Sequence, residues 1–163
     1  MHGKATSPTA STPELAAIEA REREIGVSLD YQRDMAEASP GAALRLAEIG
    51  RLARAEQNVP PQVAAIAALG ATLAEDCGDC VQIYVNLAAK AGIDRRHIKA
   101  ALDNRLTDLP PDLKLFYCFG RVVSEHAPML LEEGAAIEAR FGLKSLVDPA
   151  LTFTVARFYR TVK

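Results

Sequence analysis

Cys77 and Cys80 are the residues whose types and spacing most directly indicate chemistry, because two thiols separated by two residues can close a disulfide. A thiolate at either position can attack an oxidant or a disulfide, and the second thiol is close enough to displace the adduct. At a helix start, the unpaired amides and the helix dipole also stabilise a thiolate. The pair therefore indicates reversible dithiol chemistry.

Helical patterns precede and follow the pair, so we expect the cysteines at the beginning of a helix. With Asp76 as the N-cap residue, Cys77 is the first helical residue and Cys80 the fourth, which puts both sulfurs on one side. Asp79 then occupies the capping-box position. These acids and Glu75 also oppose thiolate formation, because nearby negative charge disfavours a second anion. We expect modest reactivity.

Two other interpretations of the cysteine pair stay open. A Cys-x-x-Cys can supply half of a zinc site, but a structural zinc site needs four ligands at compact spacing, and no second pair follows. Cys118 and His126 are only distant candidates for the remaining ligands. The two thiols can also simply pack in the core. Of the three, redox chemistry is the preferred interpretation, and it requires no metal and no other cofactor.

We expect structural roles for the remaining candidate residues. Cys118 stands among three aromatic residues and is expected to be a buried, inert thiol. His97 follows a predicted helix cap and fits a surface position. His126 ends a predicted helix, where a cation is favoured by the helix dipole. None of these residues is assigned to the site.

The composition favours an all-α fold. The chain has 163 residues, 49% of them apolar, with 6% aromatic residues and no tryptophan. Alanine dominates the apolar fraction, which favours helices over sheets. This length suits one core, so we predict a disordered tail over residues 1–10, rich in Ser, Thr and Pro, and one helical domain over residues 11–163.

The charge balance and the apolar runs exclude several classes of partner. A net charge of -2, from 19 basic and 21 acidic residues, is no basis for binding nucleic acid or an anionic membrane. The longest apolar run, Val63 to Ala74, is shorter than the roughly 20 residues of a membrane-spanning helix. The N-terminus lacks the apolar core of a secretory signal. We therefore expect a cytoplasmic protein, a location in which few disulfides are structural.

Helices must position the cysteines, and start and stop signals divide the chain into eight of them. The starts are marked by capping residues and prolines, and the ends by glycines. The expected helices are one that opens at Thr12-Pro13 and runs to about residue 24, one from Ser39-Pro40 to about residue 57, one after Pro60-Pro61 that holds the run from Val63 to Leu73, one that starts at the cysteines and continues until Gly92, one after Asp94 that stops before residue 107, two at about 111–126 and 128–141, and a last one that opens at Asp148-Pro149.

From Pro60 to about Leu102, three features occur together: a helix of small residues, Cys77-Gly78-Asp79-Cys80, and the run Asn-Leu-Ala-Ala-Lys-Ala-Gly-Ile-Asp at 86–94. This pattern resembles the carboxymuconolactone decarboxylase/alkylhydroperoxidase-D family. The resemblance implies an all-α fold with the cysteine pair at a helix N-terminus, and a homo-oligomer. In the family's peroxidases the two cysteines reduce hydroperoxides, assisted by a Glu and a His. At those two positions this sequence has Ala65 and Tyr84.

The resemblance implies an alkylhydroperoxidase-like peroxidase or a thiol–disulfide oxidoreductase that uses Cys77 and Cys80. The substrate is then a small hydroperoxide or a disulfide, and a reducing partner that the sequence does not identify closes the cycle. Tyr84, one turn beyond Cys80, can donate a hydrogen bond to its sulfur, although core packing explains an aromatic residue there equally well. Two alternatives stay open, a decarboxylase of the carboxymuconolactone type and a non-catalytic redox-sensing or binding module.

Overall fold

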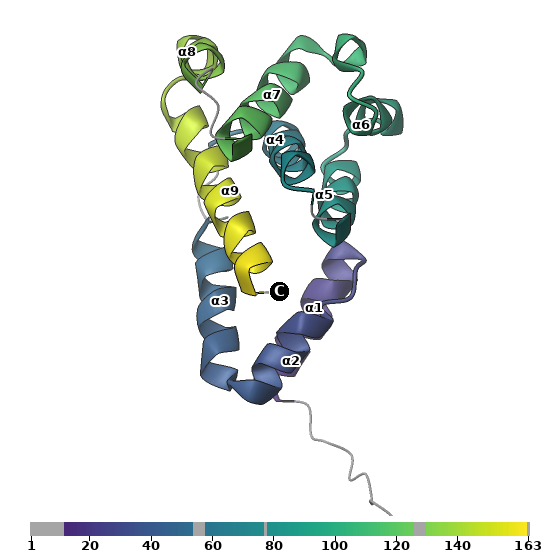
Figure 1. Cartoon of the computed structure of the whole chain (residues 1–163), viewed down its shortest axis with the longest axis vertical. Coiled ribbons are helices and arrows are strands. Elements are labelled where there is room, and N and C mark those ends of the chain that lie inside the picture. The colour runs from purple at the N-terminus through teal and green to yellow at the C-terminus, as the bar shows by residue number, and fades with distance from the viewer. Residues whose placement is uncertain (1–11, 54–57, 77, 126–129, 163) are drawn as a thin grey trace, which may run out of the picture. The chain divides into compact units, whose positions relative to one another are not determined.

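The structure, a computed structural model, describes residues 12–53, 58–76, 78–125 and 130–162. Within these ranges every regular element is a helix, which confirms the predicted all-α class (Figure 1). Residues 1–10, predicted to form a disordered tail, lie outside the described residues. No described helix is long and apolar enough to cross a membrane.

The chain divides into two compact units, residues 1–48 and residues 49–163. The first unit contains α1 (Pro13–Ile25), α2 (Asp30–Ala38) and most of α3 (Pro40–Ala53). The second contains α4 (Pro61–Ala74), α5 (Gly78–Lys90), α6 (Arg95–Leu102), a short 3-10 turn (Leu106–Asp108), α7 (Pro111–Glu125), α8 (Leu130–Phe141) and α9 (Lys144–Val162). The single domain over residues 11–163 stays a prediction.

Helix α1 begins and ends at the residues that the sequence indicates. The Thr12 side chain accepts a hydrogen bond from the Leu15 amide at 3.4 Å, and α1 ends at Gly26, which has a φ of 69°. The sequence analysis missed α2. Its start is held by Glu22, whose carboxylate accepts from the Leu29 amide at 2.7 Å and pairs with Arg33. The predicted end of α3 near residue 57 lies outside the described residues.

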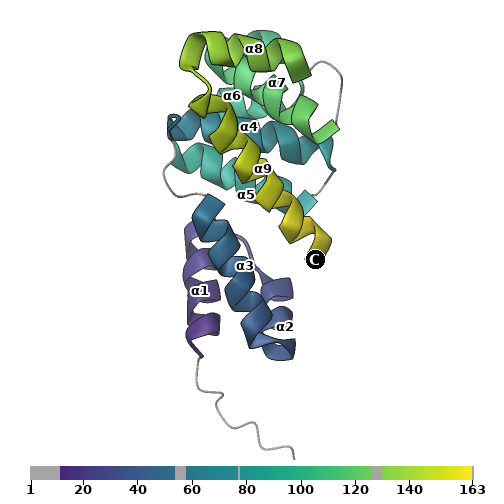
Figure 2. The ribbon, with the colours of Figure 1, turned by 90° about the vertical axis from the view of Figure 1, so that its left-hand side faces the viewer.

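Helix α4 is the centre of the second unit. Every residue from Val63 to Thr72 except Ala65 is buried, and α4 packs against α5, α6, α7 and α9 (Figure 2). The small side chains of α4 allow these neighbours to approach closely. The predicted helix after Pro60-Pro61 is therefore confirmed, and α4 determines where α5 lies.

Helices α4 and α7 cross with their backbones in contact. A Cβ atom at Gly70 would lie 2.4 Å from the Tyr117 carbonyl oxygen, and a Cβ at Gly120 would lie 1.9 Å from the Ala67 carbonyl oxygen. Both distances are far below van der Waals contact, so the crossing requires glycine at both positions. Gly70 and Gly120 are thus packing residues of the α4–α7 interface.

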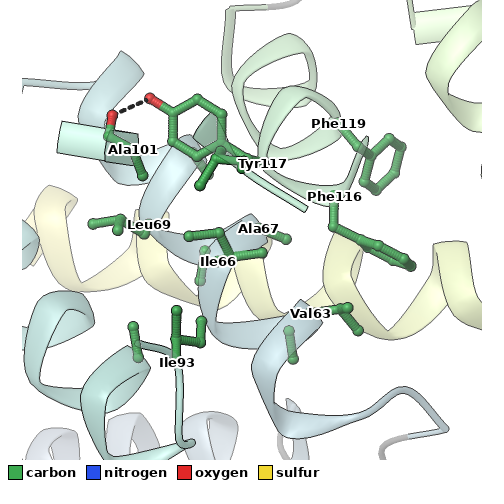
Figure 3. Close-up of a cluster of buried hydrophobic side chains, with 14 of the residues drawn as sticks. Val63, Ile66, Ala67, Leu69, Ile93, Ala101, Phe116, Tyr117 and Phe119 are labelled. Carbon is green, nitrogen blue, oxygen red and sulfur yellow. Dashed lines mark hydrogen bonds between the residues drawn. The ribbon is translucent and has the colours of Figure 1, made fainter. Parts of the chain in front are cut away.

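Aromatic side chains of α7 surround this crossing (Figure 3). Tyr117, 1% exposed, donates a hydrogen bond to the Ala101 carbonyl oxygen at 2.9 Å, which joins α7 to α6. Phe116 meets Phe141 of α8 edge to face, with ring centroids 5.3 Å apart. Phe119 packs on Phe153 of α9 at 6.1 Å, in a tilted arrangement. One helix thereby fixes α6, α8 and α9 around α4.

The predicted start of the last helix is wrong. We expected α9 to open at Asp148-Pro149, but it begins at Lys144 and contains Pro149. Asp148 does not cap a helix, because its carboxylate accepts from the backbone amide and the side-chain Nδ2 of Asn58, the latter at 3.0 Å. Pro149 lies near the helix start and is fully buried, so the lost backbone hydrogen bond is offset by apolar packing.

Gly120→Ala tests the α4–α7 crossing. We expect a loss of about 2 to 4 kcal/mol in the free energy of unfolding, because the new methyl group overlaps backbone that has no room to move. Gly78→Ala is the matched control, because a Cβ there meets no atom within 4 Å, and it should be neutral or slightly stabilising. Urea unfolding followed by circular dichroism measures both. Equal midpoints for the two variants would contradict the crossing.

Tyr117→Phe tests the α7–α6 hydrogen bond, which we expect to contribute about 1 kcal/mol at neutral pH. Burial raises the pKa of the Tyr117 phenol above its ordinary value of 10.0. The wild-type protein therefore keeps this contribution below about pH 10 and loses it as the pH rises through the folded pKa. Urea midpoints of both proteins between neutral pH and pH 11 should converge at the alkaline end. A constant difference would exclude this linkage.

Candidate functional site

Helix α5 carries Cys80, and a short connection joins it to α4. Because α5 begins at Gly78, Cys80 is its third residue and stands in the first turn, where backbone amides have no helical partners. Between the helices, the Glu75 amide bonds to the Thr72 carbonyl at 3.2 Å, which continues the last turn of α4. The site is thus anchored directly to α4, the most buried of the helices that the structure describes.

The predicted capping role of Asp76 is wrong. Asp76 has a φ of 51°, in the left-handed region, and its amide bonds to the Leu73 carbonyl at 3.3 Å. This is the conformation of a residue that ends a helix, whereas an N-cap residue is extended. No glycine stands at the end of α4, and Asp is among the residues that best tolerate a positive φ. That substitution for glycine was the signal that the sequence analysis missed.

Cys80 is half-buried and disulfide-bonded, whereas Cys118 is a free thiol. Cys77 lies outside the described residues, and so does the side chain of Asp79. The predicted placement of both sulfurs on one side of a helix therefore stays a prediction. In the structure, Cys80 is disulfide-bonded in the first turn of α5.

Tyr84 and Ala65 stand at the positions that the family resemblance associates with proton transfer. Tyr84 follows Cys80 by one helical turn, on the same face of α5. Both residues are half-buried and pack against the hydrophobic core of the second unit. This packing agrees with the interpretation of Tyr84 as a core-stripe aromatic, and a catalytic role for its phenol stays a prediction.

The surface in front of the first turn of α5 is open. Gly78 and Asp76 are exposed, and Glu75 is half-buried. A Cβ atom built at Gly78 meets no heavy atom within 4 Å, so α5 begins at the surface and faces solvent there. Along the chain, the described charged residues next to Cys80 are the acidic Glu75 and Asp76.

Cys118 differs from Cys80 in its surroundings. It lies half-buried on α7, and burial, followed by the negative charge of Glu133, raises the pKa of its thiol. At neutral pH it is therefore a thiol rather than a thiolate, which agrees with the predicted inert role. His97 is half-buried on α6, and His126 lies outside the described residues. Among the described residues, no group of three or more His, Cys, Asp or Glu side chains could hold a metal ion.

Comparisons with protein families, with curated proteins and with solved structures find no match to this chain. The assignment of the cysteine pair therefore depends on the residues and their geometry.

Differential labelling tests the distinction between the cysteines. After mild oxidation, we expect peptide mapping to find Cys77 linked to Cys80 and Cys118 unmodified. After reduction at pH 7.5, Cys118 should react with iodoacetamide more slowly than Cys80, because its raised pKa leaves little thiolate. A disulfide that contains Cys118, or bound zinc that protects Cys80 from the reagent, would contradict the redox assignment.

Proposed function

We propose that this protein is an oxidoreductase resembling the alkylhydroperoxidase-D proteins, and that it cycles Cys77 and Cys80 between a dithiol and a disulfide. The observation that carries the proposal is the disulfide-bonded state of Cys80 at the first turn of α5, with Cys118 left as a free thiol. Two cysteines separated by two residues can close a disulfide within one short segment of the chain.

The position of Cys80 favours redox chemistry over inert packing. The first-turn amides and the positive end of the helix dipole stabilise a thiolate once the disulfide is reduced. Cys118 provides the internal comparison, because it is also half-buried but lies in the middle of α7, and burial raises its pKa. These two environments support the proposal that Cys80 reacts and that Cys118 packs.

Of the two substrate classes, disulfides fit the site better than hydroperoxides. When a thiolate attacks a hydroperoxide, the departing oxygen must take up a proton, for which the resembling peroxidases use a Glu and a His. Ala65 offers no proton, and a phenol at position 84 is a poor base near neutral pH. A disulfide releases a thiolate, which leaves without such help. We therefore propose thiol–disulfide exchange as the main activity and slow peroxidase activity as a secondary one.

Turnover assays distinguish the proposed enzyme from the two alternatives. Purified protein is supplied with dithiothreitol and either a mixed-disulfide substrate or cumene hydroperoxide, and the Cys80→Ser variant should abolish both reactions. Cys118→Ser is the matched control and should retain them. Oxidation of Cys80 without turnover would instead indicate a redox sensor. Decarboxylation that persists in Cys80→Ser would support the carboxymuconolactone-type enzyme and overturn the proposal.

The double variant Ala65→Glu, Tyr84→His tests whether the missing proton groups limit peroxide reduction. We expect stopped-flow oxidation of the reduced pair by hydroperoxide to be at least about tenfold faster, or about 1.4 kcal/mol lower in barrier. Tyr84→Phe is the control and should leave the slow native rate unchanged. An unchanged rate in a folded double variant would show that these positions do not face the thiols.

A further inference from the structure

We draw no further inference here: the strongest candidate, the exposed apolar stripe that Leu143, Val147 and Leu151 form over the first turns of α9, carries none because nothing in the structure shows what covers it.

Discussion

The direct contact between the backbones of α4 and α7 is the constraint on which the second unit depends. Gly70 and Gly120 bring carbonyl oxygens to positions that a Cβ atom would occupy, so neither helix can shift or rotate without losing that fit. With α7 so close, its aromatic residues reach α6, α8 and α9, and the other faces of α4 are left for α5 and α9. The alanines of α4 have the same effect as the glycines, because their small side chains allow close packing. These alanines bury less side-chain area than larger residues would, but they let neighbouring helices approach closely. The larger side chains of α7 supply buried apolar area in return.

The surroundings of Cys80 and Cys118 differ because their helices pack differently around this crossing. Cys118 belongs to α7, whose buried face is occupied by Phe116, Tyr117 and Phe119, and it sits beside them where burial raises its pKa. Cys80 belongs to α5, which follows α4 after a short turn and packs less deeply, with Ala88 as its one fully buried residue among those described. A helix that is anchored at one side and open at its start can hold a reactive sulfur in place and still expose it.

Much of this architecture could be predicted from local signals. The glycines after α1 and α8 and the Asp94 cap of α6 have the predicted roles, because helix ends depend on a few neighbouring residues. The errors arose where contacts between residues far apart in sequence determine the local structure. Asp148 binds Asn58 instead of capping a helix, and a buried Pro149 is tolerated inside α9. The α4–α7 crossing could not be predicted either, since a glycine in a helix does not reveal which backbone it meets. The cysteine pair was evident from the sequence because two thiols at this spacing can close a disulfide regardless of tertiary contacts.

The conformation of Asp76 changes the interpretation of the acidic residues next to the cysteine pair. Asp76 ends α4 through its backbone, so its carboxylate is not used to cap α5. Near a thiolate this charge is unfavourable, because it opposes formation of a second anion. In disulfide exchange, however, the attacking thiolate can belong to another molecule, so the first step does not require a thiolate on this chain. The proposed preference for disulfides over hydroperoxides therefore depends on Ala65 and Tyr84, the two positions at which the resembling peroxidases have a Glu and a His.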